Sequence, residues 1–130
     1  MVVGSPPCRD LPQWNVHMNH PKMDPEEVKR RRWEAETHLA FCAEIYEMQV
    51  REGRHFLHEH PQTAVSWQLP VITRLLDLPG VATTVAHMCR YGMMQPDEHG
   101  EMKYVKKPTR WMSSAKWVLR RLSKTMNMCT

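Results

Sequence analysis

The sequence is organised around a short predicted strand at residues 55–61, HFLHEHP. Phe56 and Leu57 give it an apolar start, and Pro61 lacks the backbone N–H that a further ladder residue would donate, so we expect the strand to end there. Residues 1–8, MVVGSPPC, form a similar segment in which a short apolar run is stopped by two prolines. The two segments predict two strands that end in chemically reactive side chains.

Helical patterns separate these strands from each other and from later ones. Asp24 can cap a helix with Pro25 at its first position, and apolar side chains at three- and four-residue steps continue it to Gly53. The other predicted elements are a helix over 66–77, a strand over 81–88, a strand over 104–113 interrupted at Pro108, a closing helix capped by Ser113 or Ser114 and reaching Met126, and loops over 9–23 and 93–103.

The resulting order, β α β α β β α, predicts an α/β fold in a single domain spanning residues 1–130. Helices between strands imply parallel βαβ units, and the last two strands, which no helix separates, bring in one antiparallel strand. With 42% hydrophobic residues the chain can fill one modest core without the help of disulfides. A large multidomain enzyme is excluded.

Cysteine spacing and hydropathy exclude further classes. The four cysteines, at positions 8, 42, 89 and 129, form no Cys-x-x-Cys pair, so we expect reduced thiols rather than a disulfide scaffold or a zinc ribbon. No apolar run approaches the ~20 residues of a membrane span, and no signal-peptide core follows Met1. We therefore expect an intracellular protein with no membrane partner.

Two candidate catalytic residues lie at the ends of the first two predicted strands. Ligands and catalytic groups gather at the carboxyl ends of strands in a parallel sheet, and these ends carry Cys8 and Glu59. A thiolate at Cys8 could act as a nucleophile, and a nearby glutamate could hold or donate a proton. The alternative is that Cys8 is a small buried residue and Glu59 the ion-pair partner of an arginine.

Histidine and basic residues are less specific signals. His58 and His60 share a strand face and could join His55 and His87 in a metal cluster. Strand histidines without a matching set of Cys or Asp ligands are more often ordinary polar side chains that bind no metal. We therefore predict no metal site. The net charge of +4 permits a polyanion such as DNA without requiring one. Candidate phosphate contacts, which could equally be solvated faces or edge lysines, are Lys106, Lys107, Arg110, Arg30 and Arg31, with Arg120 and Arg121 in the same group.

Several motifs together resemble the second half of the catalytic domain of DNA cytosine-5 methyltransferases. They are VGSPPC at 3–8, FLHEHP at 56–61, CRYG at 89–92 and KPTR at 107–110. The resemblance implies a partial doubly wound, Rossmann-like methyltransferase sheet, mainly parallel with one antiparallel strand. It also implies that Cys8 adds to C6 of a flipped-out cytosine and that Glu59 engages N3. By the same resemblance Tyr91, Gly92 and Arg110 lie near the site. The Glu-His-Pro and Lys-Pro-Thr variants are similar to reading frames of mobile genetic elements.

The chain also departs from that family. His60 stands in place of an asparagine that would help hold the glutamate loop, only a short stretch replaces the large target-recognition insert, and the five glycines include no Gly-x-Gly turn for S-adenosylmethionine. We therefore expect no cofactor to bind to this chain alone. A missing N-terminal cofactor half, or self-association through the first strand, would complete the sheet. The alternatives are a nonenzymatic nucleic-acid-binding protein from a mobile element or a nonfunctional truncated product.

Overall fold

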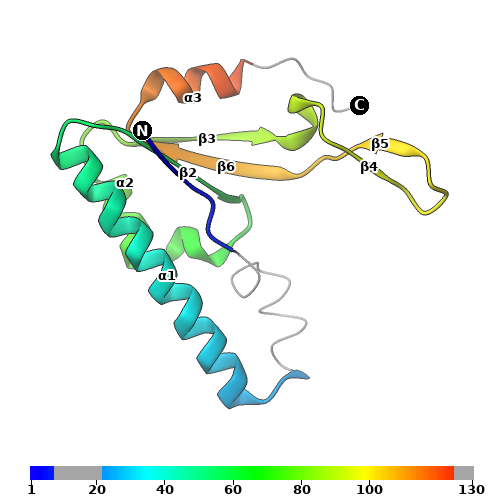
Figure 1. Ribbon diagram of the computed structural model, residues 1–130, viewed down its shortest axis with the longest axis horizontal. Helices are drawn as coiled ribbons and strands as arrows, with labels where there is room; N and C mark the ends of the chain where they lie inside the picture. The colour runs from blue at the N-terminus through cyan, green and yellow to red at the C-terminus, as the bar shows by residue number, and fades with distance from the viewer. Residues whose placement is uncertain (8–21, 125–130) are drawn as a thin grey trace.

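A computed structural model describes residues 1–7 and 22–124 of the chain (Figure 1). Its centre is a four-stranded sheet in the order β1-β2-β6-β3. Helices α1 and α2 lie on one face of this sheet and α3 lies on the other, as Figure 1 shows. The four strands are β1 (Val2–Gly4), β2 (Phe56–Pro61), β3 (Ala82–His87) and β6 (Pro108–Ser113).

The sheet is mixed. β1 pairs with β2 in parallel, Val2 opposite Phe56 and Gly4 opposite His58, whereas β6 is antiparallel to both β2 and β3. Strands β1, β2 and β3 therefore run in one direction and β6 runs against them. The α/β class, the adjacent parallel first pair and the antiparallel last strand are confirmed. Only one hydrogen-bonded pair in the described sheet is parallel, because β6 separates β2 from β3.

The first helix, α1 (Pro25–Arg51), begins as predicted. The Asp24 carboxylate accepts a hydrogen bond from the backbone N–H of Glu26 at 3.0 Å, and Pro25 takes the first helical position, where its missing N–H costs nothing. Gly53, with φ of +73°, follows the end of the helix, a conformation that glycine adopts without the steric cost of a Cβ.

The predicted helix over 66–77 is two elements, a 3-10 helix η3 (Val65–Gln68) and a shorter α2 (Pro70–Leu76). Pro70 causes the break, because the proline ring excludes the preceding residue from the helical region and Leu69 is extended, with ψ of 141°. The apolar periodicity of the segment predicted one continuous helix and gave no sign of this boundary. The break turns Ser66 and Trp67 toward β2, where both are buried.

The predicted loop over 93–103 is largely a β-hairpin, β4 (Met94–Pro96) with β5 (Met102–Tyr104), preceded by a 3-10 helix η4 (Met88–Tyr91). Its turn is built around Asp97, whose carboxylate accepts backbone hydrogen bonds from His99 at 2.8 Å and Glu101 at 3.0 Å. Polar and turn-forming residues concealed the two short strands. In Figure 1 the hairpin projects beyond one end of the sheet. The predicted loop over 9–23 lies almost entirely outside the described residues.

The closing helix, α3 (Lys116–Ser123), begins later than predicted and without a side-chain cap. The Ser113 hydroxyl instead donates to the carbonyl of Phe56 at 2.5 Å and accepts from the N–H of Ala115 at 2.9 Å, so it joins β6 to β2. Met126 lies outside the described residues. No helix in the described part of the chain is long and apolar enough to cross a membrane.

The main core lies between the sheet and the two helices α1 and α2. Tyr46 of α1 stacks on Phe56 of β2 with ring centroids 4.5 Å apart, and both side chains are fully buried. Gly4 of β1 lies against the same tyrosine, since a Cβ at this position would meet the phenol ring. β1 can therefore pack closely on α1 only because residue 4 has no side chain. Leu39, Ile72 and Met112 complete the centre of this core.

Candidate functional site

The site begins where the carboxyl ends of β1 and β2 are tied together. The Ser5 hydroxyl donates a hydrogen bond to Oε1 of Glu59, and Nε2 of His60 donates to the carbonyl of Pro6 at 2.9 Å. These bonds follow from the parallel register, which sets Gly4 beside His58 and carries the next residues of both segments past one another. The SPP segment that leads into Cys8 is thus held against Glu59. Cys8 itself lies outside the described residues.

Glu59 presents a buried polar atom for which the described residues supply no hydrogen-bond partner. The residue lies on the opposite face of β2 from His58 and His60, because successive strand residues alternate, and hence on the face that carries α3. The atom is Oε2 of the carboxylate. A buried carboxylate oxygen without a donor is an uncommon arrangement, typical of a place where a ligand or water completes the bonding.

Trp111 of β6 lies directly opposite Glu59 in the antiparallel register. Its indole Nε1 is also buried and has no hydrogen-bond partner in the part of the chain that the structure describes, so an acceptor and a donor without described partners lie on neighbouring strands. The Tyr91 ring meets the Trp111 ring edge to face at 6.4 Å, and the Tyr91 hydroxyl donates to the carbonyl of Leu122 at 3.1 Å. Tyr91 is therefore linked to Glu59 through the Trp111 side chain. Sequence reasoning missed Ser5 and Trp111, for which only strand register gives a signal.

His60 holds the two strand ends from the other face. Because a carbonyl can only accept, the bond to Pro6 puts the ring proton on Nε2, and Nδ1 then accepts from the Ser66 hydroxyl at 2.7 Å. Burial lowers the pKa of His60, which keeps the ring neutral and this arrangement intact. The histidine thus links β1, β2 and η3, and so restrains the loop beside Glu59.

His58 lies beside His60 on the same face of β2 and continues the buried polar contacts into the core. Its Nδ1 shares a hydrogen bond of 2.7 Å with the Tyr46 hydroxyl, and its ring lies 5.1 Å from that of His60. Burial lowers the pKa of His58 to about 3 and raises that of Tyr46, so both groups stay neutral at physiological pH. Nε2 of His58 is buried with no hydrogen-bond partner within residues 1–7 and 22–124.

We expect the buried His58 ring to lower the stability of the folded protein at acid pH. The folded-state pKa of His58, about 3, lies below the ~6.5 of an unfolded histidine, so as pH falls below ~6.5 the unfolded chain takes up a proton that the folded protein excludes. Each pH unit costs at most ~1.4 kcal/mol for this group, or ~2 kcal/mol at pH 5. Urea unfolding followed between about pH 7 and pH 5 measures the loss.

The control compares the buried His58 ring with the ring of an exposed histidine. His58→Gln removes the titrating group and flattens the pH dependence of the unfolding free energy by ~2 kcal/mol over this interval. His99→Gln changes a histidine whose side chain is 78% exposed and leaves the slope as it is. An unchanged slope in the His58→Gln variant would show that this ring does not stay neutral in the folded protein.

The histidines form no metal cluster in the described structure. His58 and His60 use their rings as described above, and Nδ1 of His55 lies 3.0 Å from the Ser114 hydroxyl. Among the described residues no group of three or more histidine, cysteine, aspartate or glutamate side chains is arranged to hold a metal ion.

The predicted phosphate-binding residues lie in different places. Arg30 pairs with Glu27 at 2.6 Å and with Glu34 at 2.8 Å, and Arg31 pairs with Glu27 at 3.0 Å, so acidic neighbours on α1 offset both charges. Arg110 lies 4.7 Å over the Trp67 ring on the α1 and α2 face, away from Glu59. Lys106 and Lys107 are exposed just before β6. The structure gathers none of these five side chains around Glu59.

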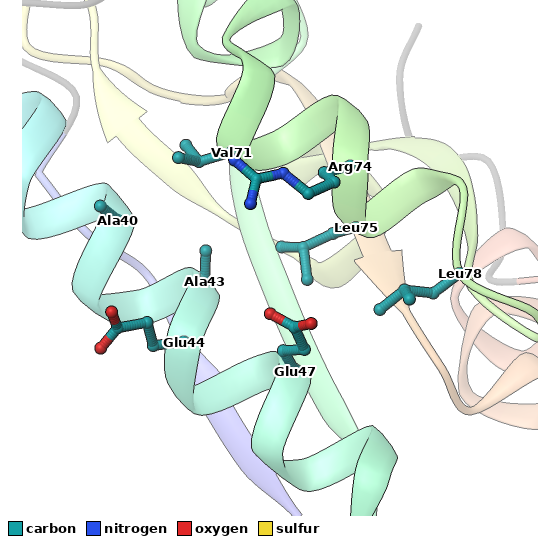
Figure 2. A pocket seen from close by; sticks show the side chains of 8 residues that line it. All are labelled: Ala40, Ala43, Glu44, Glu47, Val71, Arg74, Leu75 and Leu78. Atoms are coloured by element: carbon teal, nitrogen blue, oxygen red, sulfur yellow. The ribbon is translucent and has the colours of Figure 1, made fainter.

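A groove between α1 and α2, of about 270 Å³, lies apart from the strand ends (Figure 2). Figure 2 shows Glu44 and Glu47 of α1 on one side and Arg74 and Leu75 of α2 on the other. The charges are mixed, and no thiol, hydroxyl or imidazole lines the groove. It has the character of a seam between two packed helices rather than of a reactive site.

The expectation of reduced cysteines is wrong at Cys89. Cys89, buried in η4, is disulfide-bonded, whereas Cys42 of α1 is a free thiol. Burial raises the pKa of the Cys42 thiol, which keeps it protonated and unreactive. Cys8 and Cys129 lie outside the described residues.

Comparison with known proteins found no match of any kind: no family model, curated protein or solved structure matches this chain.

Proposed function

We propose that this chain is the catalytic half of a DNA cytosine-5 methyltransferase-like protein, with Cys8 as the nucleophile and Glu59 as the proton donor to the base. The observation that carries the proposal is a pair of hydrogen bonds that joins the two strand ends. The Ser5 hydroxyl donates to Glu59, and Nε2 of His60 donates to the Pro6 carbonyl. Three residues span at most ~11 Å, so the covalent chain keeps Cys8 within that distance of Ser5. The sheet, with one antiparallel strand, also agrees with this family resemblance.

The chemistry needs the two residues in distinct roles. The Cys8 thiolate adds to C6 of cytosine and forms an S–C6 bond, while the electrons of the C5–C6 double bond shift through the ring to N3, which takes a proton from Glu59. The product is an enamine whose C5 carries nucleophilic electron density. C5 can then take a proton from water and lose its original hydrogen to water as a proton, which restores the enamine. Expulsion of the Cys8 thiolate then reforms the C5–C6 double bond and returns the N3 proton to Glu59. Ser5 positions Glu59 for this step.

The described residues do not fit S-adenosylmethionine. Binding that cofactor on this type of sheet needs a glycine turn where backbone closely approaches the ligand. The five glycines, at positions 4, 53, 80, 92 and 100, form no Gly-x-Gly turn, and Gly4 lies against Tyr46. A cofactor half outside the given residues would supply the methyl donor. The outer edge of β1, where Val3 is 64% exposed, is the place where that half would extend the sheet.

The experiment is cofactor-free exchange of the cytosine C5 hydrogen. We expect the protein to release tritium from DNA labelled at cytosine C5, because addition and reversal of the Cys8 thiolate require no methyl donor. Cys8→Ser should abolish the release, since a serine hydroxyl is not deprotonated at neutral pH. Scintillation counting of the water fraction gives the rate.

Cys42→Ser is the matched control, since it removes a free thiol of α1 that packs against the core, on the opposite face of the sheet from Glu59, and should leave the rate unchanged. Tritium release that persists in the Cys8→Ser variant, or none from the wild-type protein on single- or double-stranded DNA, would contradict the proposed function.

A further inference from the structure

α3 carries a concentration of positive charge that its own acidic residues do not offset. Together with the residue that follows it, the helix has four cations and no aspartate or glutamate, and no ion pair joins these cations to another described residue. α1 differs, because its first arginines pair with glutamates one turn away. The four cations of α3 are Lys116, Arg120, Arg121 and Lys124.

A large aromatic side chain lies among these cations. Trp117 is 62% exposed, although an indole of this size is usually at least half buried. Arg120, Arg121 and Lys124 follow it at three, four and seven residues, so all four side chains share one face of the helix. The opposite face of α3 packs on the sheet through Leu119. The fold therefore does not need an indole at position 117.

The same helix borders a groove along the edge of the sheet. The groove, of about 540 Å³, lies between α3 and β3, the last strand in the order β1-β2-β6-β3. Lys116, Arg120 and Ser123 line one wall, Thr83 and Thr84 the other, and no carboxylate is among the described residues that line it. The groove offers two cations and the Thr84 hydroxyl to an anionic ligand, since the Thr83 hydroxyl accepts from Arg110 and the Ser123 hydroxyl donates to the Arg120 carbonyl. Through Tyr91, which bonds to Leu122 and contacts Trp111, α3 is connected to the face that carries Glu59.

We propose that the outer face of α3 and its groove against β3 bind single-stranded nucleic acid, with the four cations on the phosphates and Trp117 stacked on a base. Charge complementarity identifies an anionic polymer as the occupant. The exposed indole favours nucleic acid over an acidic peptide, since base–aromatic stacking is the usual means of holding unpaired strands. In a duplex the base faces are already stacked. This inference rests on α3 and β3 alone and does not depend on the proposed function.

The experiment is fluorescence anisotropy of a labelled oligothymidylate of about 20 nucleotides titrated with the full chain. With four phosphate contacts, a plot of the logarithm of the association constant against the logarithm of the salt concentration should have a slope of about −2.8. This slope corresponds to roughly a 50-fold loss of affinity between ~50 and ~200 mM salt. Trp117→Ala should weaken binding by about tenfold with little change in slope. Arg120→Gln with Arg121→Gln should weaken binding and reduce the slope to about −1.4.

The controls carry the same changes on α1. Trp33 is 67% exposed, so Trp33→Ala matches Trp117→Ala, and Arg30→Gln with Arg32→Gln removes the same charge from arginines already paired with glutamates. Both should bind like wild type. Equal losses in the α1 controls, tighter binding to duplex DNA, or equal competition by poly-glutamate would overturn the inference.

Discussion

Replacing Glu59 with glutamine is expected to lower the rate of cytosine C5 exchange by ~10²- to 10⁴-fold, the usual contribution of a positioned general acid. Glutamine keeps the shape of the side chain and can still accept the hydrogen bond from the Ser5 hydroxyl, so the strand ends stay together. It has no carboxylic proton to give to N3 of the base. The rate of tritium release from C5-labelled DNA measures the effect.

Two further variants sharpen this result. Glu44→Gln changes an exposed glutamate in the groove between α1 and α2 and should leave the exchange rate unchanged. Ser5→Ala removes only the bond that positions Glu59, and its loss of rate should be smaller than that of Glu59→Gln. A Glu59→Gln variant that folds and retains more than half of the wild-type rate would exclude Glu59 as the proton donor.

Replacing Gly4 with alanine is expected to destabilise the protein by about 3 kcal/mol, the upper range for overpacking a core. The added Cβ would lie 2.7 Å from Cζ of Tyr46 and closer still to its hydroxyl oxygen. The tyrosine has little room to yield, since it stacks on Phe56 and bonds to His58. Urea unfolding should show a lower midpoint with an unchanged m-value.

A double-mutant cycle identifies the contact responsible. Tyr46→Phe removes the most crowded atom, so it should cost less stability in the Gly4→Ala background than in the wild-type protein. Gly100→Ala is the matched control for alanine replacing glycine where a Cβ meets nothing within 4 Å; it adds only the strain of a left-handed alanine, ~1 kcal/mol. If Gly4→Ala cost no more than Gly100→Ala, β1 would not pack on Tyr46 as described.

Local signals in the sequence predicted most elements of the fold, because each depends on a few adjacent residues. The start of α1 follows from Asp24 and Pro25, and the ends of β1 and β2 from prolines. Boundaries that depend on competing signals were missed. Pro70 breaks the helix that apolar periodicity predicts as continuous, and Asp97 builds a hairpin turn in a stretch that composition marks as a loop.

The site was predictable only in part, for a related reason. Glu59 follows from its position at a strand end, whereas Ser5 and Trp111 meet it through strand register, which a single sequence does not encode locally. The ion pairs of Arg30 were visible in the spacing of Glu27 and Glu34, since residues three and four apart share a helix face. The contact of Arg110 with the Trp67 ring was not, because it depends on how α2 and η3 pack on the sheet.

The central claim, that Cys8 and Glu59 act together on cytosine, is tested most directly by locating a covalent bond. In an oligonucleotide with 5-azacytosine at one position, N5 takes the place of C5–H, so a thiolate that has added to C6 is trapped once N5 is protonated. Intact-mass and peptide mapping of the wild-type protein should find one adduct, at Cys8, none at the protected Cys42 thiol, and little in the Glu59→Gln variant. An adduct at another cysteine, or no adduct in the wild-type protein, would contradict the account.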